Sequence, residues 1–108
     1  MTVTTIDAAQ DVVTLVNVFT VEPERADELL ALLEEATEKV MRHRPGFVSA
    51  NLHRGLDGRH VANYAQWASE ADFAAMLADP AARQHMTAAA AMAEFAPVLY
   101  RVSSVHHA

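Results

Sequence analysis

The stretch PGFVSANLHRGLDGRHVANYAQW, residues 45–67, predicts a β-hairpin whose two strands carry His53, Asn63 and Trp67. A strand that only fills a core is typically rich in Val, Ile and Phe, so an imidazole, a carboxamide and an indole in one hairpin need another explanation. Such side chains together can hold and polarise a flat, oxygenated organic ligand. We therefore take this hairpin as the centre of the fold and as the candidate functional element.

The register of the hairpin decides which side chains share a face, because a slip of one residue moves every side chain to the opposite face. A two-residue turn at Asp57-Gly58 would place His53 on the face opposite Asn63. A three-residue loop over 56–58, with a left-handed glycine, would bring both onto one face, and we favour this loop. The predicted face then carries Phe47, Ser49, Asn51, His53, Val61, Asn63, Ala65 and Trp67.

The segments on either side of the hairpin predict one strand and three helical stretches before a final strand. Residues 12–21, VVTLVNVFTV, are β-branched and nearly continuous, which is typical of a strand buried on both faces. A helix begins at Pro23 and ends before Pro45, with apolar residues at three- and four-residue spacing. After the hairpin we expect a helix over 70–77 opened by a capping box at Ser69 and Asp72, a break at Asp79-Pro80, a helical segment over 81–93, closure at Pro97 and a strand over 98–105.

This order predicts an α+β fold with the ferredoxin-like βαββαβ plan, in which an antiparallel sheet carries helices on one face. Residues 1–11 show no periodicity and are expected to form a flexible arm, while 12–108 are expected to form a single domain. A chain of 108 residues is small enough that pairing with a second copy would add to its stability, so a homodimer is expected.

Composition and charge exclude several function classes. With 8 basic and 14 acidic residues the formal net charge is −6, and without a basic cluster neither nucleic acid nor a membrane surface is an expected partner. The absence of cysteine excludes thiolate nucleophiles and cysteine metal sites, and the histidines lack metal-ligand spacing, so no metal is expected. No signal peptide and no apolar run of ~18 residues is present, which favours a cytoplasmic protein.

Three motifs point to a family: PGF at 45–47, the H-x3-D-G pattern over 53–58, and NYAQW at 63–67 followed by Ser69-Glu70. With the order of elements, they resemble the antibiotic biosynthesis monooxygenase family of dimeric α/β barrels. NYAQW is most similar to the small cofactor-independent oxygenases that convert anthrone-type aromatic polyketides to quinones. The resemblance implies dioxygen as co-substrate, no cofactor, and a homodimer of face-to-face sheets in which each subunit has a pocket between its sheet and its helices.

The resemblance also implies roles for particular residues. Asn63 and Trp67 match the strand residues that orient the substrate and stabilise its developing anion, and His53 matches a pocket histidine. Phe73 stands where the anthrone oxygenases carry a tyrosine, and Arg83 is placed as the counterpart of an arginine on the following helix.

Dioxygen chemistry without a cofactor needs a substrate anion, because an electron-rich phenolate or carbanion can pass one electron to O2 without metal or flavin. A donor aimed at the developing oxyanion makes that anion easier to form. We predict His53 as the base or proton relay, with Asn63 and Trp67 fixing the oxyanion. The predicted apolar wall of the pocket consists of Phe47, Phe73, Met76, Leu77 and Met86, and Arg83 completes the substrate site.

Two alternatives share the fold, and fold alone does not fix function. Heme-degrading enzymes use an Asn on the first strand with a Trp and a His around the second helix, and Asn17 and His85 lie near those places. We favour heme binding less than the oxygenase hypothesis, because Met76 takes the approximate position of the helix Trp and Trp67 lies on a strand. The other alternative is a non-catalytic, ligand-binding or stress-response barrel protein.

Overall fold

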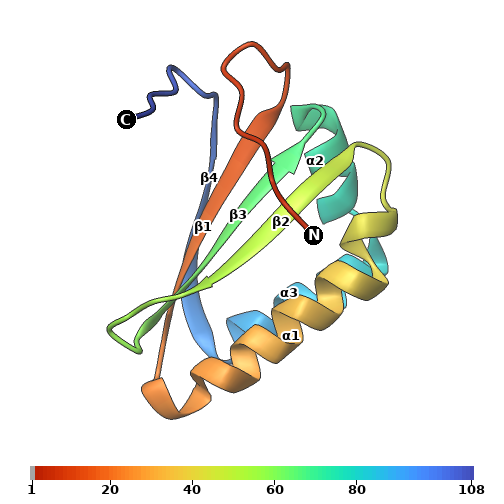
Figure 1. Ribbon diagram of the computed structural model, residues 1–108. Coiled ribbons are helices and arrows are strands. Elements are labelled where there is room, and N and C mark those ends of the chain that lie inside the picture. The colour runs from red at the N-terminus through yellow and green to blue at the C-terminus, as the bar shows by residue number, and fades with distance from the viewer. Residues whose placement is uncertain (1) are drawn as a thin grey trace.

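The computed structural model describes residues 2–108, and its four strands form one antiparallel sheet with three α-helices on one face (Figure 1). In chain order the elements are β1 (Val13–Val21), η1 (Pro23–Arg25), α1 (Ala26–Lys39), η2 (Met41–His43), β2 (Phe47–Arg54), β3 (His60–Trp67), α2 (Glu70–Leu77), α3 (Pro80–Ala90) and β4 (Ala93–Tyr100), where η marks a short 3-10 helix. The strands lie in the order β2-β3-β1-β4. The predicted ferredoxin-like α+β fold is confirmed.

Strand pairing divides the sheet into two faces, because successive side chains along a strand point to opposite sides. The inner face, toward the helices, carries Val13, Leu15, Asn17, Phe19, Val21, Ala50, Leu52, Val61, Asn63, Ala65, Trp67, Phe95, Pro97 and Leu99. The outer face carries Thr14, Val16, Val18, Thr20, Ser49, Asn51, His53, Ala62, Tyr64, Gln66, Ala96, Val98 and Tyr100.

Polar side chains determine where α2 and α3 begin. The backbone N–H of Asp72 donates to Ser69 Oγ at 3.1 Å, which confirms the predicted cap of α2. Asp79 Oδ1 accepts from the N–H of Ala81 at 2.8 Å, and Pro80 occupies the first turn of α3, where its missing N–H costs nothing. The predicted break between the two helices is therefore confirmed.

The last strand starts earlier than we predicted. We expected helix up to residue 93 and a strand from residue 98, but α3 ends at Ala90 and β4 runs from Ala93 to Tyr100. Pro97, the expected end of the helical region, lies inside β4. Because β4 is an edge strand that pairs only with β1, it tolerates a residue without an N–H.

The predicted hairpin register is wrong. His53 pairs with Ala62, and Leu52 pairs with Asn63, so His53 lies on the outer face and Asn63 on the inner face. The loop has four residues, Leu56 to Arg59. It is closed by a hydrogen bond of 2.7 Å from the Gly55 N–H to the His60 carbonyl. An even-length loop gives the same pairing as the two-residue turn that we did not favour.

Asp57 explains the extra loop residue. Its Oδ1 accepts from the backbone N–H of Arg59 at 2.9 Å and of His60 at 3.2 Å, so the turn extends through Arg59. The Arg59 N–H, together with the His60 side chain, lowers the pKa of the Asp57 carboxyl. Gly58 has the left-handed φ of 73° that we expected.

A bulge at the other end of the hairpin restores one predicted position. The pairing shifts between Phe47 and Ser49, so Phe47 faces Trp67 on the helix side although Ser49 lies on the outer face. The predicted face is thus correct for β3 and for Phe47, and wrong for the rest of β2.

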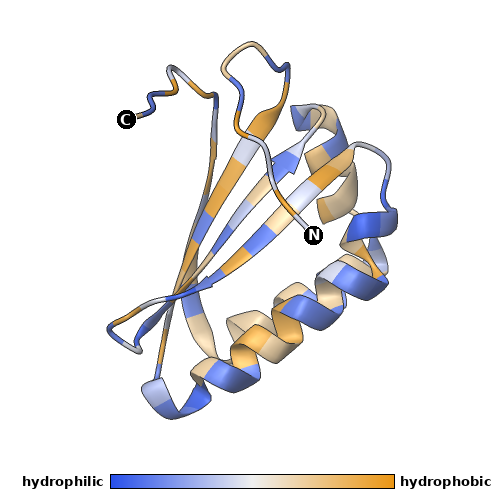
Figure 2. Cartoon of the chain, viewed as in Figure 1, coloured by the Kyte–Doolittle hydropathy of each residue, from blue (hydrophilic) through white to orange (hydrophobic). Residues whose placement is uncertain are grey.

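Apolar side chains of the inner face and the helices form two core clusters. Trp67, 2% exposed, packs with Leu15 and Met76, while Leu29 of α1, fully buried, packs with Phe19 in the second cluster. Figure 2 shows the hydrophobic side of α1 turned toward the sheet. Both clusters contribute to the wall of one large cavity, described below.

The first residues of the chain lie across the outer face, near the ends of β2 and β3 (Figure 1). Thr4 Oγ1 donates to Asn51 Oδ1 at 2.5 Å, and Gln66 Nε2 donates to the Thr5 carbonyl at 2.9 Å. The segment that we expected to be a flexible arm therefore has defined contacts with the sheet. Across residues 2–108, no helix has the length and apolar character needed to cross a membrane.

Candidate active site

A cavity of about 580 Å³ lies between the inner face of the sheet and the helices. This volume falls in the range of ~300–1,000 Å³ that is typical of small-molecule sites. Its wall consists of Leu15, Asn17, Phe19, Leu33, Ala36, Thr37, Met41, Phe47, Ala50, Asn63, Ala65, Trp67, Phe73, Met76, Leu77, His85, Met86, Ala89, Phe95, Pro97, Val98 and Leu99. The wall is apolar except at a few positions, and those positions decide what the cavity can bind.

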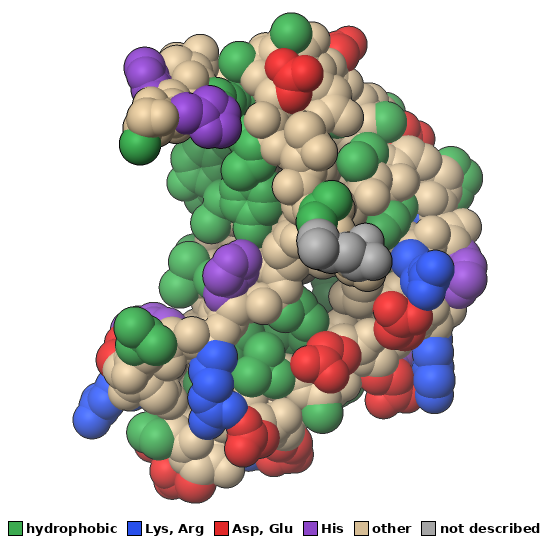
Figure 3. Space-filling view, in the orientation of Figure 1, with side chains coloured by type: hydrophobic (Ala, Val, Ile, Leu, Met, Phe, Trp, Pro, Cys, Tyr) green, Lys and Arg blue, Asp and Glu red, His purple; other side chains and the backbone are tan. Residues whose placement is uncertain are grey.

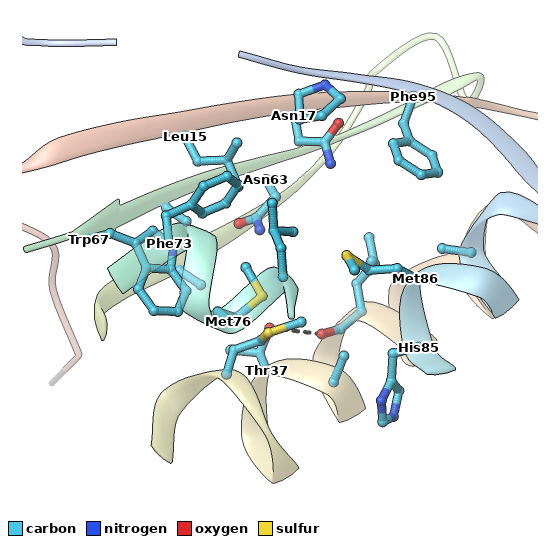
Figure 4. A pocket seen from close by; sticks show the side chains of 18 of the residues that line it. Leu15, Asn17, Thr37, Asn63, Trp67, Phe73, Met76, His85, Met86 and Phe95 are labelled. Carbon is cyan, nitrogen blue, oxygen red and sulfur yellow. Dashed lines mark hydrogen bonds between the residues drawn. The ribbon is translucent and has the colours of Figure 1, made fainter. Parts of the chain in front are cut away.

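Asn17 and Asn63 are the polar groups on the sheet side. They pair directly across β1 and β3, the two central strands, so their carboxamides are neighbours at the cavity wall (Figure 4). The Oδ1 atom of each is buried without a hydrogen-bond partner, and neither side chain makes a hydrogen bond to any other described residue. A buried polar group without a partner costs ~1–3 kcal/mol. An amide oxygen only accepts, so two adjacent oxygens in this state indicate a site that a hydrogen-bond donor of a ligand, such as a hydroxyl group, completes, while the Nδ2 groups beside them remain able to donate.

Aromatic side chains form one end of the cavity. The ring centroids of Phe47 and Trp67 are 5.5 Å apart at an interplanar angle of 89°, and those of Trp67 and Phe73 are 6.1 Å apart at 70°. Both are edge-to-face contacts, which fix the indole plane more firmly than aliphatic packing would. Trp67 therefore presents a rigid surface to a flat ligand.

The helix side of the cavity is formed mostly by α1 and α3. Thr37 of α1 donates its hydroxyl hydrogen to the Leu33 carbonyl at 2.8 Å (Figure 4). His85 of α3 is half-buried and is the only titratable side chain on the cavity wall. The remainder of this side is Met41, Met86 and small or aliphatic residues, which gives an unbranched, adaptable surface. Within residues 2–108 no cluster of acidic and imidazole side chains is arranged to hold a metal.

The cavity reaches solvent along the edge of the sheet. Phe95, a wall residue on the inner face of the edge strand β4, is 36% exposed. On the opposite, buried side Trp67 and Met76 close it. The cavity is therefore open beside β4, at Phe95.

Most of the predicted site residues lie on this wall. The structure brings together Asn63, Trp67, Phe47, Phe73, Met76, Leu77 and Met86. His53 does not reach the cavity, because the four-residue loop turns it to the outer face, where its Nδ1 lies 3.1 Å from the Asn51 carbonyl. Arg83 also lies elsewhere: it is exposed, and because it precedes His85 by two residues it points to the other side of α3. The predicted placements of His53 and Arg83 are therefore wrong.

Asn17 and His85 line the cavity, but the sequence analysis did not include them among the expected residues of the oxygenase pocket. A signal existed for Asn17, because an amide inside the β-branched run of residues 12–21 has to find a partner or a ligand. We considered both residues only for heme binding. Their position around one cavity depends on the pairing of β1 with β3 and on the docking of α3.

Comparisons with known proteins found a matching family model and a related protein of similar length. Residues 12–88 match the family described as ABM, antibiotic biosynthesis monooxygenase. The tetracenomycin-F1 monooxygenase of Streptomyces glaucescens is 48% identical over 99 residues, which cover 92% of this chain and 88% of that protein.

Two solved structures extend the comparison. The monooxygenase ActVA-Orf6 of Streptomyces coelicolor, in complex with nanaomycin D, superposes with a TM-score of 0.81 at 27% identity, covering 92% of this chain and 94% of its own. SnoaB, a cofactor-independent oxygenase from Streptomyces nogalater, superposes with a TM-score of 0.73 at 30% identity, covering 88% of this chain and 96% of its own.

Proposed function

The chain belongs to the antibiotic biosynthesis monooxygenase family, and on this premise we propose that it oxidises an anthrone-type aromatic polyketide to a quinone with dioxygen in the cavity behind its sheet. The relative that is 48% identical acts on tetracenomycin F1, and SnoaB is a cofactor-independent oxygenase. The observation that carries the proposal is the pair of unpartnered amides, Asn17 and Asn63, in an otherwise apolar cavity of about 580 Å³.

The amide pair stabilises the anion that the reaction needs. When an anthrone loses a proton from its methylene carbon, the charge moves to the carbonyl oxygen. The N–H groups of Asn17 and Asn63 donate to that oxygen, and the apolar surroundings strengthen the contact relative to water. Because the amides are already in place, no reorganisation is needed as the charge develops.

Dioxygen then reacts with the anion in balanced steps. The anion gives one electron to O2, and the resulting carbon radical and superoxide combine to form a C–O bond. The peroxide takes up a proton, and loss of the second methylene hydrogen as a proton expels the distal oxygen as hydroxide, which together give water. The net change is CH2 + O2 to C=O + H2O, so no external reductant enters the reaction.

The aromatic end of the cavity positions the substrate. Trp67, fixed between Phe47 and Phe73, offers a flat surface for a fused-ring system. Phe73 has no hydroxyl, so it contributes area and no proton. Met76, Leu77 and Met86 complete the apolar wall. Arg83 and His53 have no role in this scheme.

We propose that the functional unit is a homodimer formed through the outer face of the sheet. Val18, Val98 and Tyr100 lie together on this face and are 42%, 46% and 50% exposed, and grouped exposed apolar side chains are typical of an interaction surface. Figure 3 shows hydrophobic side chains gathered in a hollow on this side of the molecule. A second copy packed sheet to sheet removes this surface from water.

The test of the oxidation is oxygen uptake by metal-free protein with a panel of anthrones and dihydroxynaphthalenes. We expect enzyme-dependent uptake with quinone formation, lost in Asn17→Ala and Asn63→Ala and retained in His53→Ala, which removes a side chain from the outer face. Uptake equal to the buffer blank throughout the panel would overturn the proposal.

A hemin titration separates the heme alternative. Asn17 and His85 both reach the cavity, so this alternative keeps its two expected residues. We expect no Soret shift that depends on His85. A saturable shift lost in His85→Ala, together with no oxygen uptake, would favour heme binding.

A further inference from the structure

We infer that Met76 is an oxidation site: a hydroperoxide formed on the substrate passes one oxygen atom to the Met76 sulfur, and this modification inactivates the protein. The inference rests on the proposed function, in which a carbon-bound hydroperoxide forms inside the cavity. Met41, Met76 and Met86, three of the five methionines in the chain, line that cavity. Peroxides convert a thioether to the sulfoxide. The cavity therefore surrounds an oxidant with groups that the oxidant can modify.

The packing of α2 on the sheet holds Met76 next to the pair of amides. Met76 is 4% exposed and belongs to the buried cluster that contains Leu15 and Ala65. Leu15 pairs with Ala65 across the two central strands, and the next pair on the same face is Asn17 with Asn63. Neighbouring pairs on one face are ~7 Å apart along the strands. A fused-ring substrate is longer than this spacing, so a substrate bonded to the amides extends to Met76. Figure 4 shows Met76 and Asn63 in the same part of the cavity.

The oxygen transfer is balanced without a further reactant. The sulfur lone pair attacks the distal oxygen of the hydroperoxide, the O–O bond breaks, and the peroxide proton passes to the oxygen that stays on carbon. Sulfur loses two electrons and becomes the sulfoxide, while the hydroperoxide gains them and becomes an alcohol. The substrate then leaves as a hydroxyanthrone in place of the quinone, so each transfer is a turnover that stops before the oxidation is complete.

A sulfoxide at Met76 disturbs the aromatic end of the cavity. Met76 lies in the same buried cluster as Trp67, whose ring is fixed by Phe47 and Phe73. A sulfoxide is polar and larger than the thioether, so its burial among apolar side chains is unfavourable. Activity should therefore fall as the oxidised fraction of Met76 rises.

Met92 provides a control within the same molecule. It is half-buried, packs against the other core cluster and lines a second pocket together with Glu22 and Glu94. Because Met92 is more exposed than Met76, hydrogen peroxide added to the solvent should oxidise Met92 first. A hydroperoxide formed in the cavity should oxidise Met76 first. The order of oxidation therefore reports where the oxidant was formed.

The test follows methionine oxidation while the purified protein oxidises an anthrone with dioxygen, in the presence of catalase to remove free hydrogen peroxide. Cleavage after arginine gives a peptide of residues 60–83, in which Met76 is the sole methionine, and a peptide of residues 84–101 that contains Met92. Tandem mass spectrometry locates each added oxygen atom. We expect sulfoxide at Met76 to exceed that at Met92 several-fold and to rise with the number of turnovers. In Asn63→Ala, or without dioxygen, it should stay near its starting level.

Two matched variants connect the modification to the loss of activity. Met76→Leu keeps an apolar side chain of similar volume that peroxides do not oxidise. Relative to its own initial rate, its oxygen uptake should decline several-fold more slowly than that of wild type, whereas Met92→Leu should decline as wild type does.

Three results would overturn the inference: oxygen uptake without sulfoxide at Met76, equal oxidation of Met76 and Met92 during turnover, or an unchanged decline in Met76→Leu. Oxidation of Met76 before Met92 by added hydrogen peroxide, without substrate, would also overturn it, because the cavity would then not be the source of the selectivity. An absence of oxygen uptake by wild type would instead count against the proposed oxidation itself.

Discussion

Asn63 and Asn51 are the same residue type on neighbouring strands of one sheet, yet their surroundings differ. Asn51, on the outer face, donates to the Tyr64 carbonyl at 2.8 Å and accepts from Thr4 at 2.5 Å. Asn63, on the inner face, has a buried Oδ1 without a partner and faces an apolar cavity. The comparison suggests that the Asn51 amide stabilises the fold and that the Asn63 amide binds a ligand. The following variants test this difference in role.

The largest effect is expected for Asn63→Ala. Removing one oxyanion donor typically lowers turnover by ~10²–10³-fold. Its effect on stability should be small or favourable, because the variant also removes a buried group without a partner. Oxygen-uptake kinetics measure the change in turnover, and urea unfolding measures the change in stability. Full activity in the variant, or a stability loss as large as that of Asn51→Ala, would remove the distinction between the two faces.

The next largest effect concerns the apolar part of the outer face. Val18 is 42% exposed on the central strand β1, so Val18→Asp should leave the subunit folded. If a second copy covers this face, the variant buries an unpaired carboxylate in the interface and the dimer should dissociate. Light scattering at micromolar concentration measures the mass. A dimeric variant, or a monomeric wild type, would contradict the proposed assembly.

Asn51→Ala should have the opposite profile from Asn63→Ala. The variant loses the bonds to Tyr64 and Thr4, which should cost about 1–2 kcal/mol in the free energy of unfolding. Turnover per folded molecule should stay unchanged, because Asn51 points away from the cavity. Urea unfolding and oxygen uptake on the same sample measure both quantities, and a tenfold drop in turnover would mean that the outer face also takes part in the reaction.

The smallest effect should come from Asp57, which fixes the loop that separates the two faces. Hydrogen bonds from Arg59 and His60 lower the pKa of its carboxyl below the ordinary value of 3.8. A depressed pKa in the folded state adds stability above pH 3.8, and this contribution is lost as the pH falls through the folded-state value. The stability difference between wild type and Asp57→Asn should therefore be present at pH 7 and vanish at low pH in urea unfolding. A constant difference down to pH 2 would contradict it.

Local sequence predicted most of the fold because its signals act over short distances. The Ser69 and Asp79 caps, the apolar spacing of α1 and the alternation along β3 each depend on residues within one or two turns. The NYAQW string, residues 63–67, was enough to indicate the family that the comparisons confirmed. These signals also placed the Trp67 aromatic end of the site.

The wrong predictions concern positions where a loop longer or shorter by one residue changes the face on which a side chain lies. The loop extends to Arg59, which turns His53 to the outer face, and residues 55–59 are compatible with more than one loop length. Local sequence predicts Pro97 as the end of a helical region, whereas the edge position of β4, which tolerates proline, is a property of the assembled sheet.

The sequence by itself determined the order of strands and helices, the helix caps, the family and the aromatic end of the cavity, because these depend on neighbouring residues and on short motifs. Only the tertiary structure decided that Asn17 lies beside Asn63, that His85 reaches the same cavity and that His53 does not. Each of these depends on pairing or packing between segments far apart in the chain. There, a shift of one residue reverses the face of a side chain and barely changes the composition of the segment.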